Sequence, residues 1–567
     1  MNLRAPSSAS LFSTAWRWPA LLLLAAWITG CASLPSEVDR PMSTALANPE
    51  QTRIGNAVQQ RAAKAGTRND SGFALVNSAE LAFTSRMALI NAAQKTLDIQ
   101  YYAIHADETT DRMFDALRAA AARGVRIRIL LDDFNTAGKN AQVLKIAFEP
   151  NIELRLFNPL PGNRRSLFFR ILGSLKDVDR IQRRMHNKIF VADNAVAITG
   201  GRNLGETYFG QGEGTNFVDA DILAAGRIAR ELSRSFDLYW NNPLAYPVQS
   251  LMTREEIEKI KPPPAPKTAA PLDGAAGPGA AGAATASVAT APTPAPDKPA
   301  GVRTTTAPDG TVSVIEPLPE STNLALLDWT WAPAVLLVDK PSKIAADADT
   351  VEAAQDTTVD GLLQLMSQAS GDLLIVSPYF VPGPRMMEQF AAIRQKGVRI
   401  RVLTNSLASN DAPAAHVGYA RYRKELLALG IEIYEMRAEQ EGSLTSFGST
   451  GSSGSAGGSR ASLHSKIVVL DQSLLVIGSM NLDLRSQLQN TEVALAIRSP
   501  KLANETIALI EPAMARGAYK VELENGLLVW RAPQGSKLAD TRVEPDASTG
   551  LKLMLKLIGP FAPEEML

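Results

Sequence analysis

Histidine, lysine, aspartate and asparagine recur with one fixed spacing at two places in this 567-residue chain. The first copy, MHNKIFVADNAVAITGGRN, covers 185–203, and the second, LHSKIVVLDQSLLVIGSMN, covers 463–481. Both copies follow the pattern H-x-K-x4-D-x6-G-[GS]-x-N. The residues at the fixed positions are His186, Lys188, Asp193 and Asn203 in the first copy, and His464, Lys466, Asp471 and Asn481 in the second.

These residue types suit chemistry on a phosphodiester. A histidine with a pKa near its usual value of about 6.5 can attack phosphorus when neutral and donate a proton when charged. Lysine and asparagine bind phosphoryl oxygens and stabilise their negative charge. Two such half-sites brought together would surround one phosphodiester, and this design needs no cofactor. Because the chain has 4 histidines, 1 cysteine and no H-E-x-x-H or C-x-x-C motif, it lacks the ligands of a metal hydrolase.

A β-hairpin is the element that must position each copy. The segments KIFVAD and KIVVLD are rich in β-formers, and the period of two in a strand places histidine and lysine on the same face. The second strand ends in small residues, which allow the backbone to approach a ligand closely. Asp193 and Asp471 end the first strand of each hairpin. We therefore expect these two aspartates to anchor the turn or pair with a base, rather than touch the substrate.

The repeat extends well beyond the two hairpins. Residues 95–133 and 371–406 share one plan, in which an apolar strand and aromatic residues precede a helix, the sequence GVRIR and a second strand. Strands that alternate with helical stretches are typical of a parallel sheet with crossover helices. The sequence predicts two copies of one α/β module, each a mixed, mostly parallel sheet flanked by helices. We expect them to pack about a pseudo-two-fold axis with one composite active site.

Composition sets the boundaries of these modules. With 45% hydrophobic residues, the chain can bury two cores, and its 58 basic residues balance 58 acidic ones, so no overall charge predicts a polyanionic partner. Residues 261–312 are rich in Pro, Ala, Gly and Thr and predict a disordered linker. The predicted parts are a signal peptide (1–31), a tether (32–69), module 1 (70–255), a linker and connecting segment (256–345), module 2 (346–520) with a Gly/Ser-rich insertion (448–459), and a C-terminal extension (521–567). We expect the insertion to be a flexible loop, with an active-site lid as the alternative.

The N-terminus resembles that of a bacterial lipoprotein. The apolar run ALLLLAAWI follows Arg4 and Arg17, is too short to cross a bilayer, and ends at ITGC, which resembles a lipobox. The signal peptide would then be cleaved before Cys31, and Cys31 would be lipidated. Ala32 replaces the aspartate that retains lipoproteins at the inner membrane, so the expected location is the outer membrane, facing the periplasm. The alternative is a soluble secreted protein with one free thiol.

The duplicated motif resembles the phospholipase D superfamily over roughly 70–250 and 345–515. The segments SGFALV, LDIQYYAIHAD, RRMHNKIFVADNAVAITGGRNLGETYF and GSMNLDLRSQLQNTE are similar to bacterial cardiolipin synthases, particularly the lipoprotein-type branch. This resemblance implies a phosphohistidine intermediate, with His186 as the nucleophile and His464 as the acid and base. It also implies carboxylates that orient the imidazoles. These are Glu492 in QNTEVAL and Asp219 in NFVDADI, with Asp221 as the alternative to Asp219.

Two further histidines and two amphipathic segments remain to be placed. His416, in AHVGYARYRKELL, is either close to the acceptor head group or a structural helix residue, and His105 has no assigned role. Residues 163–185 show apolar residues at helical spacing, flanked by basic ones, which predicts either a helix docked on an anionic lipid surface or one packed on the core. The segment LKLMLKLIGPF near the C-terminus admits the same two interpretations. The basic residues are Arg164, Arg165, Arg170, Lys176, Arg180, Arg183 and Arg184.

The sequence therefore predicts a membrane-tethered phosphatidyltransferase. The favoured reaction transfers a phosphatidyl group from phosphatidylglycerol or phosphatidylethanolamine to phosphatidylglycerol and forms cardiolipin. Hydrolysis by a phospholipase D is the alternative within the same chemistry. A nuclease is disfavoured because no long polybasic stripe with aromatic residues is present, so no nucleic-acid partner is expected. A non-catalytic binding protein is disfavoured because both motifs are intact. The sequence does not specify whether a partner protein is needed.

Overall fold

The computed structural model describes most of the chain outside its N-terminus and linker. The described residues are 34–67, 69–162, 164–174, 177–212, 214–259, 303–306, 312–315, 318–319, 321–345, 357–439 and 460–558. Cys31 with the predicted signal peptide, residues 261–302 of the predicted linker and the insertion 448–459 lie outside these residues. Predictions made for those segments therefore have no structural counterpart here.

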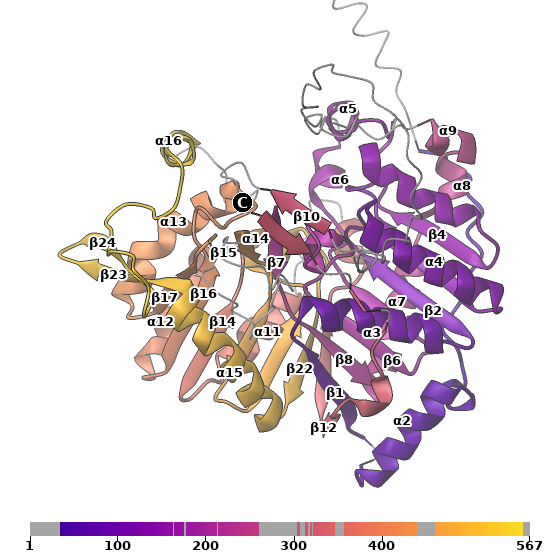
Figure 1. Cartoon of the computed structure of the whole chain (residues 1–567), viewed down its shortest axis with the longest axis horizontal. Helices are drawn as coiled ribbons and strands as arrows, with labels where there is room; N and C mark the ends of the chain where they lie inside the picture. Colours follow the sequence, from indigo (N-terminus) through magenta and orange to yellow (C-terminus); the bar gives the residue numbers. More distant parts are fainter. Residues whose placement is uncertain are drawn as a thin grey trace, which may run out of the picture.

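Module 1 is a nine-stranded sheet with helices on both faces (Figure 1). The order across the sheet is β12-β1-β8-β6-β5-β2-β3-β4-β9. Its strands are β1 (Ser71–Val76), β2 (Thr96–Tyr101), β3 (Arg126–Asp132), β4 (Ile152–Phe157), β5 (Ile189–Ala192), β6 (Val196–Gly200), β8 (Asp221–Ala225), β9 (Ala245–Pro247) and β12 (Thr330–Ala332). The main helices are α3 (Ala79–Ala92), α4 (Glu108–Ala122) and α7 (Arg227–Trp240).

Module 2 repeats this plan in a second nine-stranded sheet. Its order is β13-β22-β20-β19-β14-β16-β17-β23-β24. The strands are β13 (Ala334–Val338), β14 (Asp372–Val376), β16 (Arg399–Asn405), β17 (Glu432–Met436), β19 (Ile467–Leu470), β20 (Leu474–Gly478), β22 (Val493–Arg498), β23 (Ala518–Glu524) and β24 (Leu527–Arg531). The main helices are α11 (Thr358–Met366), α12 (Gly383–Gln395), α13 (Pro413–Ala428) and α15 (Pro500–Gly517). The predicted pair of α/β modules is confirmed.

The balance of strand directions differs from the prediction. In module 1, β3 pairs in parallel with β2 and β4, and in module 2, β16 pairs in parallel with β14 and β17. The other neighbours within the two sheets are antiparallel. Crossover helices such as α4 produce the parallel pairs, whereas tight hairpins join the motif strands, and a tight hairpin is necessarily antiparallel. The expectation of mostly parallel sheets is therefore wrong, although the sheets are mixed as predicted.

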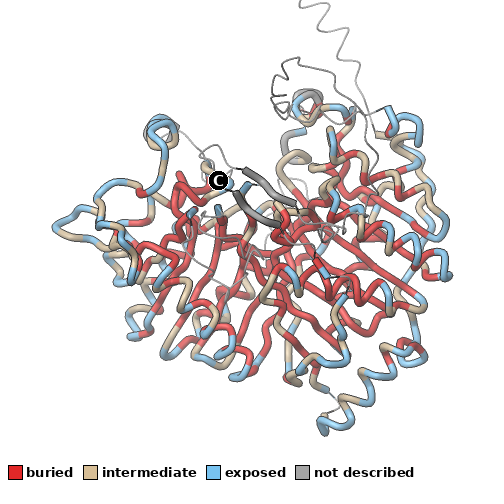
Figure 2. Tube along the Cα trace, in the orientation of Figure 1, coloured by how far each residue is buried: buried red, intermediate tan, exposed pale blue. Residues whose placement is uncertain are grey.

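A hydrophobic core is shared between the modules. Phe73, Ile189 and Leu232 of module 1 lie in one buried cluster with Leu374 and Ile477 of module 2. Figure 2 shows buried backbone running from one sheet to the other without an exposed layer between them. Because burial of apolar surface is the dominant stabilising contribution to folding, this cluster fixes the modules relative to each other. The half-sites on the two hairpins are thereby held in a fixed relation.

Three segments outside the predicted modules also join the fold. The connecting segment contributes an edge strand to each sheet. These strands are β12 in module 1 and β13 in module 2, and only Pro333 separates them. The C-terminal extension continues sheet 2 through β23 and β24 and then forms α16 (Thr549–Ile558), while the tether contains α2 (Arg53–Lys64). Among the described residues, no helix has both the length and the apolar character to cross a membrane.

The expected basic helix over residues 163–185 is wrong. The described part of this region forms two short helices, α5 (Leu167–Gly173) and α6 (Val178–Gln182). Arg164 and Arg170 are buried and both pair with Asp133, and Arg184 pairs with Asp132 at 2.8 Å. The two buried aspartates at the end of β3 need cationic partners, so these arginines point inward rather than form a solvated face.

Candidate active site

Each motif histidine is held by backbone from the opposite module. The His186 amide donates to the carbonyl of Thr491 at 2.9 Å, and the His464 amide donates to the carbonyl of Val218 at 2.9 Å. The second contact extends a parallel pairing between β7 (Thr215–Val218) and β18 (Arg460–Leu463), which joins the modules. The two motifs therefore meet at the module interface, although they are far apart in sequence.

The carboxylates that contact the imidazoles also cross the interface. His186 Nδ1 lies 2.9 Å from Oε2 and 3.1 Å from Oε1 of Glu492, and His464 Nδ1 lies 2.7 Å from Oδ2 of Asp219. A carboxylate accepts hydrogen bonds, so it places the proton on Nδ1 and leaves Nε2 to react. The predicted carboxylates Glu492 and Asp219 are thus beside the imidazoles. Asp221, the alternative to Asp219, instead pairs with Arg86 at 2.9 Å.

The small residues at the end of each hairpin make room for these carboxylates. A Cβ atom at Gly201 would lie 2.3 Å from Oδ1 of Asp219, so only glycine fits beside that side chain. The corresponding residue in module 2 is Ser479, whose hydroxyl donates to Oε2 of Glu492. Ser486 donates to the other oxygen, Oε1, at 2.9 Å. Glu492 therefore shares its charge between His186 and two hydroxyl groups.

The two imidazoles differ in their electrostatic surroundings. Burial and the charges of Lys188 and Lys466 lower the pKa of His186 well below its usual value. Burial and Lys466 also lower the pKa of His464, but the hydrogen bond and charge of Asp219 oppose this effect. Burial raises the pKa of Glu492, whereas His464 and Lys466 outweigh burial and lower the pKa of Asp219. His464 therefore has the more fully charged carboxylate partner.

Both motif lysines are buried beside the histidines. Lys188 Nζ donates to the carbonyl of His186 at 2.8 Å, and Lys466 Nζ donates to that of His464. Burial lowers the pKa of Lys188 to about 7 and that of Lys466 to about 8. Two partly neutralised ammonium groups in a dry site would regain full charge when an anionic phosphodiester enters.

We expect that Lys188→Met stabilises the fold while it abolishes activity. Burial of the Lys188 ammonium costs more free energy than the charge of Glu492 returns, since its pKa is lowered overall. Replacing it with an apolar side chain of similar length should therefore raise the free energy of unfolding by about 1 to 3 kcal/mol at about pH 6. The pKa of Lys188 is lower in the folded chain than its usual 10.5, so the cost is greatest below pH 7 and disappears as pH rises toward 10.5. Thermal unfolding of both proteins across this range measures the effect. A stability difference that grows with pH would contradict it.

The two asparagines are placed differently. Asn203 accepts from the amide of Ala103 at 3.2 Å and donates to the hydroxyl of Tyr208 at 3.0 Å, so both ends of its side chain are engaged within module 1. Asn481 is equally buried, but its Oδ1 has no hydrogen-bond partner among the described residues. Of the two, Asn481 has the side-chain polar group left for a ligand.

Asp193 and Asp471 lie at the hairpin turns. Asp193 is fully buried, and its carboxylate accepts the amides of Gln94, Lys95 and Thr96 at 2.9, 2.7 and 2.9 Å. Asp471 accepts the amides of residues 370, 371 and 372 at distances from 2.7 to 3.2 Å. Both have positive φ angles, 50° and 47°, as tight hairpin turns require. These contacts fit turn anchoring and do not reach the imidazoles.

Asp193→Ala should therefore destabilise the fold without changing the chemistry. The substitution leaves three amides without an acceptor, of which that of Thr96 is buried and the other two are partly buried, so we expect a loss of about 2 kcal/mol in the free energy of unfolding. Urea unfolding measures this loss, and the pH dependence of the remaining activity at low temperature should match that of the parent. Asp471→Ala, at a more exposed turn, is the matched variant and should cost less. A shifted pH profile for Asp193→Ala would place this residue in the reaction centre instead.

The other two histidines lie outside the contacts of the reaction centre. The ring of His105 stacks against Tyr208 at 6.2 Å, and Tyr208 in turn packs edge-on against His464 at 5.3 Å. His416 is fully buried in α13, where its Nε2 lies 2.9 Å from Arg423 and 3.6 Å from Glu544. The helix interpretation of His416 is therefore favoured over contact with the acceptor. No group of three or more His, Cys, Asp or Glu side chains in the described ranges could hold a metal ion.

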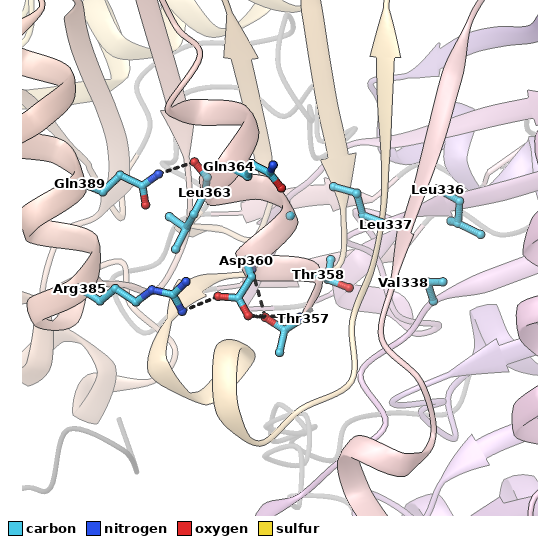
Figure 3. Close-up of a pocket in the computed structure, with 11 residues that line it drawn as sticks. Leu336, Leu337, Val338, Thr357, Thr358, Asp360, Leu363, Gln364, Arg385 and Gln389 are labelled. Carbon is cyan, nitrogen blue, oxygen red and sulfur yellow. Dashed lines mark hydrogen bonds and ion pairs between the residues drawn. The ribbon is translucent and has the colours of Figure 1, made fainter. Parts of the chain in front are cut away.

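A separate cavity of about 630 Å³ lies beside β13, between α11 and α12 (Figure 3). Asp360 in its wall accepts from Arg385 at 2.6 Å and from the hydroxyl of Thr357 at 2.7 Å (Figure 3). None of the motif residues lines this cavity. The reaction is therefore assigned to the module interface and not to this cavity.

Comparison with known proteins agrees with this geometry. The family described as cardiolipin synthase, PLD-like domain matches residues 87–240 and 362–512. Cardiolipin synthase C of Escherichia coli (strain K12) is 34% identical over 489 residues, which are 86% of this chain and 94% of that protein. The chain belongs to the phospholipase D-like family of cardiolipin synthases. The predicted class of a phospholipase D-type phosphatidyltransferase is thereby confirmed.

Two further relatives of this phospholipase D-like chain cover nearly its whole length. A protein of Helicobacter pylori (strain ATCC 700392 / 26695) is 28% identical over 533 residues, which are 93% of this chain and 95% of that protein. The crystal structure of phosphatidylserine synthase from Haemophilus influenzae Rd KW20 superposes with a TM-score of 0.52 at 13% identity. It covers 90% of this chain and 99% of that one. At this low identity, the structural match shows a shared fold.

The phospholipase D-like site includes side chains that the sequence analysis did not assign. Tyr102 packs edge-on against His186 with ring centroids 5.1 Å apart, and Phe217 lies 5.0 Å from the ring of His464. Ser479 and Ser486 hold Glu492. The serines lie in GSMNLDLRS, inside the motif region, so their proximity to the motif was the available indication. Nothing in the sequence distinguishes these aromatic residues from ordinary core residues.

Proposed function

We propose that this chain forms cardiolipin from phosphatidylglycerol and a second phospholipid through a covalent phosphohistidine. One observation carries the proposal. Two imidazoles, each paired with a carboxylate from the opposite module, lie with two buried lysines at one interface. A symmetric pair of activated imidazoles suits a double displacement, in which one alcohol leaves phosphorus and another returns to it.

In the first step, His186 is the nucleophile. Its Nε2 attacks phosphorus while the bond from phosphorus to the head-group oxygen breaks, and His464 Nε2 gives its proton to the leaving alcohol. Burial and the two lysines lower the pKa of His186 well below its usual value and keep this imidazole neutral, whereas Asp219 opposes the lowering of the pKa of His464. This difference supports the assignment of nucleophile and acid that the family resemblance implies.

In the second step, the transfer is reversed with a new alcohol. His464, now neutral, removes the proton from a hydroxyl of phosphatidylglycerol as that oxygen attacks phosphorus. The bond from phosphorus to Nε2 of His186 breaks, and the phosphatidyl group leaves as part of cardiolipin. Lys188 and Lys466 stabilise the charge on the non-bridging oxygens in both steps. If water replaces the lipid alcohol, the product is phosphatidic acid.

We propose that the chain acts in the bacterial cell envelope. Lipidation at Cys31 would tether it to the membrane that supplies phospholipids, and the lack of aspartate at position 32 favours the outer membrane, facing the periplasm. Labelling of cells with a fatty acid, followed by membrane fractionation of the wild type and of Cys31→Ser, tests this location. We expect Cys31→Ser to lose the fatty-acid label while its expression stays at the level of the wild type.

Lipid conversion by the purified protein tests the proposed reaction. The wild type is added to vesicles of phosphatidylglycerol and phosphatidylethanolamine with a chelator present, and products are followed by mass spectrometry beside His186→Ala and His464→Ala. We expect cardiolipin from the wild type alone. Phosphatidic acid in its place would identify a hydrolase. Absence of both products with a correctly folded protein would contradict the proposed function.

A further inference from the structure

An exposed carboxylate, Asp411, lies on the His464 side of the reaction centre. It precedes α13, and the hydroxyl of Tyr379 donates to both of its oxygens at 2.9 Å. The hydroxyl of Ser462 lies 3.4 Å from Oδ1. Ser462 is two residues before His464 along an extended segment, so both side chains project from the same face. Asp411 therefore faces the same space as the imidazole of His464.

Aromatic rings line this space beside the carboxylate. Phe217, which is opposite Ser462 in the β7–β18 pairing, lies 5.0 Å from the His464 ring. Tyr208 stacks on Phe217 at 4.6 Å and meets His464 edge-on at 5.3 Å. Phe217 and Tyr379 are only partly buried. A carboxylate beside aromatic faces is the arrangement that binds an ammonium group, through charge and through cation–π attraction.

Asp411 forms no ion pair within the part of the chain that the structure describes. No ion pair joins it to a described lysine, arginine or histidine, and the side chains that donate to it are the hydroxyl groups of Tyr379 and Ser462. Many other carboxylates near the module interface do have such partners, for example Asp221 with Arg86 and Asp339 with Lys343, each at 2.9 Å. Asp411 instead stays exposed, and its negative charge acts on His464 and Lys466.

The His186 side of the site has the opposite character. Burial and the charges of Lys188, Lys466 and the partly buried Arg485 lower the pKa of His186. Burial and Lys466 lower the pKa of His464 as well, but there Asp219 and Asp411 oppose them. Tyr102 is the aromatic neighbour there, and Lys188 lies 5.8 Å from its ring centroid. The two halves of a nearly symmetric site thus differ in charge, and a substrate with a cationic end has one favourable orientation.

We propose that Asp411, with Tyr379, Tyr208 and Phe217, forms a head-group subsite that binds the ammonium group of a zwitterionic donor phospholipid. The inference rests on the proposed function, since the head group leaves as the alcohol that His464 protonates. In this orientation, the phosphorus faces His186 and the ethanolamine ammonium faces Asp411. The subsite selects the donor and takes no part in bond making.

Release of head groups from mixed vesicles tests the subsite. Vesicles of equimolar phosphatidylethanolamine and phosphatidylglycerol are incubated with the full chain, and free ethanolamine and glycerol are measured. Asp411→Asn keeps the size and the contact with Tyr379 but removes the charge. We expect its ethanolamine release to fall roughly tenfold relative to its glycerol release. Asp115→Asn, at a carboxylate that is 76% exposed on α4, is the matched control and should leave the ratio unchanged.

A binding measurement separates this inference from the proposed reaction. The variant His186→Ala is titrated calorimetrically with glycerophosphoethanolamine and with glycerophosphoglycerol, with and without Asp411→Asn. We expect tighter binding of the ethanolamine compound, and loss of that preference with Asp411→Asn. If neither the release ratio nor the binding preference depends on Asp411, the subsite is wrong even when cardiolipin forms. A preference that depends on Asp411 supports the subsite even if the products differ from those proposed.

Discussion

His464→Asn lowers transfer from natural phospholipids by about a thousandfold, but a donor whose leaving group needs no proton largely restores the first step, in which the leaving group is released. A natural head group leaves as an alkoxide unless an acid protonates it, and His464 is the acid in the proposed mechanism. A phosphatidyl ester of p-nitrophenol releases a stable phenolate, so the acid is no longer needed. His186→Asn removes the nucleophile, and its activity should stay abolished with both donors.

The measurement is the release of p-nitrophenol in the first turnover in detergent micelles, because His464 is also the base of the second step. It is compared with ethanolamine release from phosphatidylethanolamine for the wild type and both variants. Thermal unfolding of each protein checks that the fold stays intact when an imidazole no longer donates to Asp219 or Glu492. If the activated ester restores activity to His186→Asn but not to His464→Asn, then His464 is the nucleophile and His186 is the acid. Equal rescue of both would mean that neither histidine bonds to phosphorus.

Local spacing in the sequence was enough to predict the reactive groups. The motif brings histidine and lysine to one strand face, and the aspartate to a turn, through contacts of a few residues, so no long-range knowledge is needed. The positions of Glu492 and Asp219 also followed from the family pattern. What spacing cannot reveal is that each carboxylate serves the other module's histidine. Those contacts join residues 306 and 245 positions apart and depend on how the modules pack.

The basic segment before the first motif shows why composition alone misled. Arg164, Arg170 and Arg184 look like part of a solvated or membrane-facing surface until the fold places Asp132 and Asp133 beneath them. A buried carboxylate at a strand end has no distinctive local sequence pattern, because its burial comes from elements that pack over it later. The direction of the motif strands was missed for a related reason. Alternating strands and helices suggested parallel pairing, but short hairpins decide the direction where the site lies.

The cross-module carboxylates make a second large effect testable. Asp219→Asn should lower kcat/KM by about a thousandfold, because an amide no longer fixes the tautomer of His464 or stabilises its charged form. Asp219 raises the pKa of His464, so its loss lowers that pKa. The acid must be protonated to work, and the alkaline limb of the pH profile should therefore move to lower pH.

Glu492→Gln provides the comparison for Asp219→Asn. Glu492 contacts the neutral nucleophile His186 and is also held by two serine hydroxyls, so its loss should lower kcat/KM by a similar factor but leave the alkaline limb in place. Full pH profiles of ethanolamine release by the wild type and both variants separate the two effects. If the limb moves with Glu492→Gln and not with Asp219→Asn, then His186 is the acid, and each carboxylate acts in the step opposite to the one proposed.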